Sequence, residues 1–196
     1  YISPSLKSVT KAGRWGMGKK SQPWNITPPD FFKESEEARS LFCQIIGSSS
    51  EDIAIIPAVS YGIATAALNL PIKKNENVVV LEEQFPSNYY GWVENVKRAD
   101  GELIVVSRPE EGSLTTAVLT AINEKTAVVA LPNCHWTDGT VLDLLEVSTK
   151  CRQYGAALVL DLAQSAGVIP FSVKEIDPDF VIAPSYKWLL GPYSLG

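Results

Sequence analysis

Six short and nearly continuous apolar runs, each followed by a longer mixed segment, constrain the fold of this chain more than any other feature. The runs are rich in Val, Ile, Leu and Ala and do not alternate with polar residues. Such runs are typical of strands that are covered on both faces of a sheet. They are Ile53–Pro57, Asn77–Glu82, Glu102–Ser107, Ala127–Pro132, Ala157–Asp161 and Asp179–Ala183.

Segments with helical spacing of apolar residues lie between or before these runs. They are Pro29–Ile46, Ser60–Leu70, Ser87–Ala99, Leu114–Asn123 and Leu142–Tyr154. The last of them ends at Gly155, where a helix C-cap is expected. Alternation of strands and helices predicts an α/β fold with a mostly parallel sheet flanked by helices. Because no repeat or linker interrupts the pattern, we expect residues 1–196 to form one domain.

Composition excludes several classes of function. The net charge is -5 and no basic stripe is present, so nucleic acid is not expected as a partner. No apolar stretch reaches the roughly 18 residues that a membrane span needs. The three cysteines, Cys43, Cys134 and Cys151, are odd in number and show no CxxC spacing. We therefore expect no disulfide framework, no metal site and a reducing, cytoplasmic location.

A lysine follows the last predicted strand. In open α/β sheets, ligands bind beyond the carboxyl ends of the strands, so residues at these positions are candidates for a site. Lys187 stands between Tyr186 and Trp188. Burial among aromatic side chains lowers the pKa of a lysine and favours a nucleophilic amine. The alternative is a surface lysine whose aliphatic stem covers a turn.

A carboxylate ends another apolar run. Asp161 follows Leu158, Val159 and Leu160, and a buried carboxylate is costly unless a positive group lies beside it. A protonated pyridine nitrogen would be such a group. The alternative is that Asp161 caps the segment that follows, since Asp is a preferred N-cap residue.

Two further junctions carry suitable side chains. Ser60 and Tyr61 lie where a strand runs into a helix, and backbone N–H groups at a helix N-terminus form a phosphate site. The alternative is a simple serine cap. Phe85 follows the run Asn77–Glu82, where its ring can lie over a flat ligand. The alternative for Phe85 is plain packing in the core.

Taken together and in this order, these segments resemble one family. DLAQSAG at 161–167 and SYKWLLGP at 185–192 are similar to the D-x-A-Q and S-x-K-x-x-x-G-P segments of the class V aminotransferase family. This family of fold-type I pyridoxal-phosphate (PLP) enzymes includes cysteine desulfurases, selenocysteine lyases and kynureninases. QFPSN at 84–88 resembles the kynureninase segment whose aromatic residue stacks on the cofactor. The resemblance covers nearly the whole chain. It implies that residues 1–196 are the large PLP-binding domain of the aspartate-aminotransferase superfamily, without its C-terminal small domain.

The resemblance also implies roles for residues around the cofactor ring. Lys187 would form a Schiff base with pyridoxal 5'-phosphate and later move the Cα proton of the substrate. Asp161 would pair with the N–H of the pyridine ring, so that the ring acts as an electron sink. Gln164 would contact the 3-oxygen of the ring, and Phe85 would stack on its face. The phosphate would be held by the backbone N–H groups of Ser60 and Tyr61 and by the hydroxyls of Ser185 and Tyr186.

The sequence departs from the family pattern in two places. Many members have a histidine where Phe85 stands. Desulfurases and their relatives have an asparagine near the 3-oxygen, in a segment that ends in Gly-Thr, and here that segment reads PNCHWTDGT at 132–140. His135, the one histidine of the chain, and its neighbour Trp136 are both candidates for the cofactor contact, and the sequence leaves the choice open.

The resulting functional prediction is a PLP-dependent enzyme that acts on a small amino acid, as an aminotransferase or as a Cα/Cβ lyase. We expect a homodimer, a substrate carboxylate-binding group beyond Gly196, and association with little turnover for the 196-residue chain alone. The alternative is a truncated, non-catalytic homologue that binds PLP or acts only as an assembly partner. A dinucleotide-binding domain is a third interpretation, but no G-x-G-x-x-G follows the predicted strands.

Overall fold

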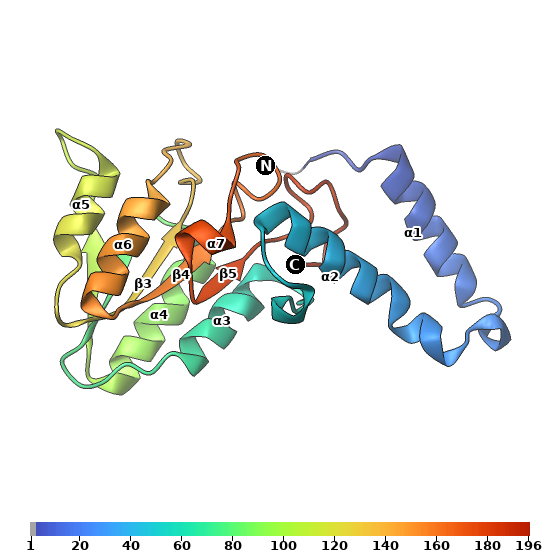
Figure 1. Cartoon of the computed structure of the whole chain (residues 1–196), viewed down its shortest axis with the longest axis horizontal. Coiled ribbons are helices and arrows are strands. Elements are labelled where there is room, and N and C mark those ends of the chain that lie inside the picture. Colours follow the sequence, from blue (N-terminus) through green and yellow to red (C-terminus); the bar gives the residue numbers. More distant parts are fainter. Residues whose placement is uncertain (1–2) are drawn as a thin grey trace.

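A five-stranded parallel sheet lies at the centre of the molecule in the computed structural model, which describes residues 3–196 (Figure 1). The strand order is β2-β1-β3-β4-β5, and every neighbouring pair is parallel. This confirms the predicted α/β fold class. The strands are β1 Asn77–Leu81, β2 Glu102–Val106, β3 Thr126–Pro132, β4 Ala157–Asp161 and β5 Phe180–Ile182.

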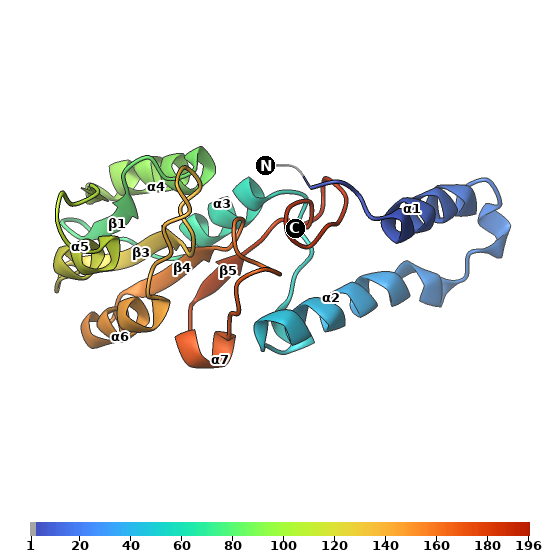
Figure 2. The same ribbon diagram turned by 90° about the horizontal axis from the view of Figure 1, so that it is seen from above.

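Helices cover both faces of the sheet, which explains why the strands read as continuous apolar runs (Figure 2). Successive side chains of a strand point to opposite faces. Val78 and Val80 therefore pack with α3 (Val59–Asn69) and α4 (Pro86–Ala99). Val79 and Leu81 belong to a second core with α5 (Leu114–Ala121) and α6 (Leu144–Tyr154).

Local hydrogen bonds set the ends of the helices on the second face. Asp143 accepts hydrogen bonds from the backbone N–H groups of Leu145 and Glu146, so α6 begins at Leu144 and not at Leu142 as predicted. It ends at Tyr154 and is capped by Gly155, whose positive φ of 69° suits a residue without a side chain. The helix α5 ends at Ala121, two residues before the predicted Asn123.

The N-terminal third differs most from the prediction. One helix was predicted for Pro29–Ile46. The structure instead has a 3-10 turn, η2 (Pro28–Phe31), followed by the helix α2 (Lys33–Ile46). Thr27 and Asp30 form a reciprocal capping box that closes the short turn, which explains the break before α2. The structure also contains two helices that were not predicted, α1 (Lys7–Lys19) and α7 (Val173–Ile176). Short 3-10 turns occur at Pro23–Asn25 (η1) and Ser50–Asp52 (η3).

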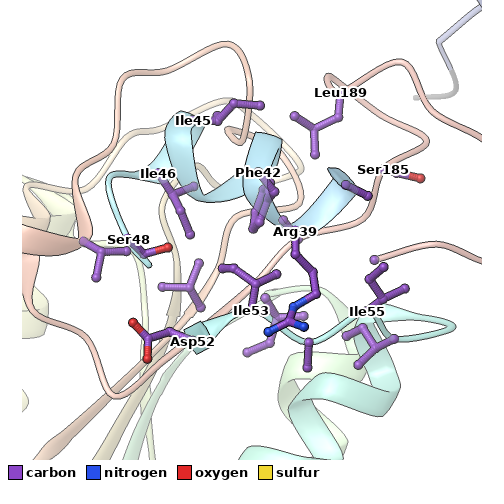
Figure 3. Close-up of a pocket in the computed structure, with 18 of the residues that line it drawn as sticks. Arg39, Phe42, Ile45, Ile46, Ser48, Asp52, Ile53, Ile55, Ser185 and Leu189 are labelled. Carbon is purple, nitrogen blue, oxygen red and sulfur yellow. The ribbon is translucent and has the colours of Figure 1, made fainter. Parts of the chain in front are cut away.

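The predicted strand Ile53–Pro57 is wrong: this segment is extended but is not part of the sheet. Ile56 exchanges two backbone hydrogen bonds with Gly196, both 2.8 Å long. An apolar groove of about 360 Å³ lies between this segment, α2 and β5 (Figure 3). Phe42, Ile45 and Leu189 are among its lining residues. Its isoleucines line this groove, and Ile56 also packs against the core that contains α3, so the run is apolar although its backbone does not pair with β5.

None of the helices in residues 3–196 combines the length and the apolar character that crossing a bilayer requires.

Candidate active site

The candidate site lies at the carboxyl edge of the sheet, where the strand order reverses between β1 and β3. Such a switch point is where open α/β sheets bind ligands. The segments that follow β1, β3, β4 and β5 converge there on a small pocket. Its lining residues are Gln84, Phe85, Asn88, Pro132, Cys134, Trp136, Asp161, Ala163, Gln164 and Lys187.

Asp161 is the last residue of β4 and lies between Pro132 and Ile182 in the sheet register. Only 4% of its surface is exposed. One carboxylate oxygen accepts a hydrogen bond of 2.9 Å from the backbone N–H of Ala163. Burial raises the pKa of Asp161 to about 6, while this hydrogen bond and the nearby Lys187 act in the opposite direction. The residue therefore orders the turn after β4 and also presents a buried carboxyl group to the pocket.

Lys187 lies in the loop after β5 and is 6% exposed, which contradicts the alternative of a surface lysine. Burial lowers the pKa of its amine, and the charge of Asp161 partly offsets this effect. The ammonium nitrogen lies 5.5 Å from the centroid of the Phe85 ring, within the range of a cation–π contact. Two oppositely charged side chains and an aromatic ring thus share one water-poor pocket.

The loop that carries Lys187 is held by short-range contacts. Ser185 donates its hydroxyl to the carbonyl of Pro192 at 2.7 Å. Its own carbonyl accepts the N–H of Gly191 at 2.8 Å. A Cβ atom at Gly191 would lie 2.8 Å from the Ser185 side chain, so a larger residue does not fit there. This close approach explains the glycine in SYKWLLGP and fixes the place of Lys187.

Trp136, and not His135, lines the pocket. The Trp136 ring meets Phe85 edge to face, with 5.5 Å between centroids, and its indole N–H donates to the carbonyl of Glu83 at 2.7 Å. His135 is buried beside the pocket, with Nδ1 2.8 Å from the Thr137 hydroxyl and Nε2 3.2 Å from the carbonyl of Glu82. Both nitrogens of His135 thus have protein partners. A cofactor contact by this histidine remains a prediction.

The four residues predicted to hold a phosphate do not line this pocket. Ser60 and Tyr61 lie in the first turn of α3, where the Tyr61 N–H donates to the carbonyl of Ala58 at 3.0 Å. The Ser185 hydroxyl closes the lysine loop, as described above. Tyr186 stacks on Tyr193 with 4.5 Å between ring centroids. The structure therefore brings together Phe85, Asp161, Gln164 and Lys187, and leaves the phosphate contacts as predictions.

Two pocket residues, Gln84 and Asn88, were not assigned a role from the sequence. Asn88 is 1% exposed, and its Oδ1 accepts a hydrogen bond of 3.2 Å from the indole N–H of Trp92. Its Nδ2 is buried and has no hydrogen-bond partner within residues 3–196. A buried unpaired donor costs about 1–3 kcal/mol, so such a group calls for an acceptor. The spacing of Asn88 and Trp92, four residues apart on one helix, was the available sequence signal.

These side chains fit a flat, cationic ring that carries polar substituents. Phe85 offers an aromatic face, Asp161 a negative partner, Asn88 a donor and Lys187 an amine. The pocket has a volume of only about 10 Å³, room for about one water molecule. A ring of that kind therefore requires rim side chains to move. Trp136, which is 42% exposed, is the most exposed of the lining residues and is the one we expect to move.

Residues 29–196 match the family model described as aminotransferase class-V. Across 97% of its length the chain is 32% identical to the uncharacterized aminotransferase YcbU of Bacillus subtilis, of which it covers 54%. A cysteine desulfurase from Thermococcus onnurineus superimposes with a TM-score of 0.86 at 22% identity, over 99% of this chain and 50% of that one. A structure of C-DES with glycine covalently linked to its PLP cofactor gives a TM-score of 0.84 at 17% identity, over 100% and 53%. The chain thus spans about half the length of these proteins.

Proposed function

The chain belongs to the aminotransferase class V family, and from this premise we propose that the protein binds PLP at Lys187 and acts on a small amino acid. The reaction is that of an aminotransferase or of a Cα/Cβ lyase. The observation that carries the proposal is the burial of Lys187 and Asp161 in one pocket beside Phe85, at the switch point of the sheet. A buried pair with perturbed pKa values in a pocket is a signature of a functional site.

Each side chain has a definite task in this proposal. When bound, PLP supplies an electron-withdrawing ring that stabilises negative charge at the Cα atom of the substrate. The Asp161 carboxylate holds a positive charge on the ring nitrogen, the role for which a buried carboxylate is suited. The lowered pKa of Lys187 increases the neutral amine, which can form a covalent bond and then accept or return a proton at Nζ. Phe85 covers the ring and excludes water.

Other parts of the prediction belong to the same proposal. They are a homodimer, a cytoplasmic location, and the phosphate contacts of Ser60, Tyr61, Ser185 and Tyr186. The family model and the buried pocket support a cofactor-dependent enzyme. The substrate and the choice between transfer and elimination depend on groups that approach the substrate itself.

Covalent trapping tests the assignment of Lys187. The protein is incubated with PLP, reduced with borohydride and digested, and the modified peptide is identified by mass spectrometry. We expect the label on the peptide that carries Lys187, and we expect Lys187→Ala to lose it. Lys125→Ala, which changes an exposed lysine, serves as the matched control and should keep the label. Equal labelling of the Lys187→Ala variant contradicts the proposal.

An exchange experiment separates the enzyme from the non-catalytic alternative. With PLP bound, the protein is mixed with small amino acids in deuterated water, and the loss of the Cα proton is followed by NMR. Little turnover is expected of residues 1–196 alone, so only the exchange step is followed, and an enzyme of this class should accelerate it through Lys187 above the rate with free PLP. Stable PLP binding without any accelerated exchange would favour the homologue that only binds the cofactor.

A further inference from the structure

Two loops meet where the strand order reverses, one after β1 and the other after β3. The loop after β3 folds back on itself, since the backbone N–H of His135 donates to the carbonyl of Thr140 at 2.8 Å. The loop after β1 contains Glu83, whose positive φ of 54° is strained for a residue with a side chain. Such a conformation persists only where surrounding contacts hold it. The loop after β3 supplies these contacts.

The side chains of two consecutive residues, His135 and Trp136, hold the turn at Glu83. The indole N–H of Trp136 donates to the carbonyl of Glu83 at 2.7 Å, and Nε2 of His135 lies 3.2 Å from the carbonyl of Glu82. These carbonyls belong to the two peptide groups on either side of the Glu83 Cα atom, so both of the planes that rotate about it are fixed. Phe85, two residues further on, packs edge to face on the Trp136 ring. We name His135 and Trp136 the clasp.

The neighbours of His135 determine which ring nitrogen carries the hydrogen. The carbonyl of Glu82 can only accept, so Nε2 must donate. Nδ1 faces two groups that can donate to it, the Thr137 hydroxyl at 2.8 Å and the Thr137 backbone N–H at 3.5 Å. Asp138 also lies 3.8 Å from Nδ1, but its carboxylate is paired with Arg108 at 2.7 Å. His135 is therefore assigned the ring form with hydrogen on Nε2 alone.

We propose that His135 is a positioning residue of the candidate site, whose Nε2–H bond to Glu82 holds the strained turn and thereby fixes the Phe85 ring beside Lys187. Its effect on the cofactor rests on the proposed function, whereas the hydrogen bond itself does not. His135 acts through the backbone of the turn and lies beside the pocket, not on its lining. It is 3% exposed and Trp136 is 42% exposed, so the His135 bond is the one better shielded from water.

Two amide substitutions separate the two ring nitrogens of His135. The side-chain nitrogen of glutamine reaches about as far as Nε2 of histidine, whereas that of asparagine reaches only about as far as Nδ1. His135→Gln should therefore keep the bond to Glu82, and His135→Asn should lose it. Both replacements are polar and uncharged, so the glutamine variant is the matched control for placing an amide at this buried position.

The ring form of His135 can be measured directly, because it is the one histidine of the chain. A long-range ¹H–¹⁵N NMR spectrum of the cofactor-free protein shows which ring nitrogen carries a hydrogen. We expect hydrogen on Nε2 alone, exchanging with water more slowly than in free histidine. A hydrogen on Nδ1, with or without one on Nε2, would overturn the inference. This spectrum needs no variant, so it decides even if a substitution at this position prevents folding.

Binding of PLP tests the effect of His135 on the site. The readouts are the dissociation constant and the circular dichroism of the bound cofactor's absorbance band, which depends on how firmly its ring is held. His135→Asn should weaken binding about 10-fold and reduce the dichroism, whereas His135→Gln should stay within about twofold of the unaltered protein. Equal losses in both variants, or none in His135→Asn, would overturn the inference. If the unaltered protein fails to bind PLP at Lys187, the proposed function itself is wrong, and the NMR spectrum still decides the ring form of His135.

Discussion

The sheet and the N-terminal arm of this molecule, defined here as residues 7–32, make opposite use of large apolar side chains. Inside the sheet, Val79, Val129 and Val159 are fully buried. In the arm no residue is buried, and Met17 and Trp24 are 81% and 77% exposed. Figures 1 and 2 show α1 and the first half of α2 reaching away from the sheet. Apolar composition alone therefore does not determine burial.

The difference lies in the number of partners that each region has. The inner strands β1, β3 and β4 have a strand on each side and a helix layer on both faces, so nearly all their side chains are buried, whereas the edge strand β2 leaves Val105 39% exposed. The arm is tied by the ion pair of Lys19 and Glu34 and meets no second apolar layer within the described residues. Since hydrophobic stabilisation follows the area removed from water, we expect the free energy of unfolding to come almost entirely from the sheet and its helices.

A pair of tryptophan substitutions tests this contrast with the largest expected effect. Trp92 is fully buried between α4 and the sheet, so Trp92→Ala should lower the free energy of unfolding by about 3–5 kcal/mol. Trp24→Ala should change it by less than about 0.5 kcal/mol. Denaturant unfolding followed by circular dichroism measures both. A comparable cost at Trp24 would show that the arm is packed in solution.

Within the buried region, the ionised carboxylate of Asp161 should lower the free energy of unfolding. Its pKa in the folded state is raised to about 6 from an ordinary 3.8, so the folded state binds the proton more tightly than the unfolded state. The contribution of Asp161 to stability should therefore be greatest below pH 3.8 and should be lost as the pH rises through about 6. Asp161→Asn should stabilise the cofactor-free protein at pH 7.5 by up to about 3 kcal/mol, less whatever attraction to Lys187 is lost.

The control for this prediction is Asp138→Asn. Hydrogen bonds from Thr140 lower the pKa of Asp138, so its ionised form is the favoured one and no gain is expected at pH 7.5. Thermal unfolding at pH 4 and pH 7.5 gives the comparison, and the gain from Asp161→Asn should nearly vanish at pH 4. A gain of the same size at both pH values would mean that the charge of Asp161 is not the cause.

The smallest expected effect concerns the contact between the residues that precede the arm and the loop that follows the sheet. The Ser3 hydroxyl, just before the arm, lies within hydrogen-bond distance of two carbonyls of the lysine loop, those of Lys187 at 2.5 Å and Tyr186 at 3.0 Å. Ser3→Ala should loosen this loop by about 1 kcal/mol. Hydrogen exchange of the amides at 185–191 is the measurement, and Ser5→Ala, at an exposed position, is the control. Unchanged hydrogen exchange at 185–191 would show that the N-terminal segment does not stabilise the loop.

The parts of the fold that the sequence predicted well are those with a local signal. The strand β4 was predicted residue for residue because a continuous apolar run ends at Asp161. The run Ile53–Pro57 carries the same signal, yet pairing depends on a neighbouring strand, which a local pattern does not contain. The helix α1 was missed although its apolar residues gather on one side, because Gly13, Gly16 and Gly18 lower its helix propensity and none of its residues is buried.

In the candidate site, too, the sequence indicated only the residues that have a local signal. Lys187 and Asp161 were singled out because one follows a strand, the other ends one, and both belong to recognisable segments. The unpaired amide of Asn88 was not visible, since it depends on which amide atom Trp92 engages and on what remains unpaired afterwards. The choice between His135 and Trp136 also needed three dimensions, because it depends on the way the segment 133–142 folds back after β3.

The buried thiol of Cys151, on α6, can be used to time how long α6 stays packed against the sheet. Burial raises the pKa of this thiol to about 12, and only the thiolate reacts with disulfide reagents. Cys151 packs in the same core as Leu158 and Leu160 of β4, whereas Cys43 and Cys134 are partly exposed. A reagent in excess should therefore consume two thiols early, and the third only as fast as α6 detaches from the sheet. The delay between these two phases measures how long α6 stays packed against β4, the strand that carries Asp161.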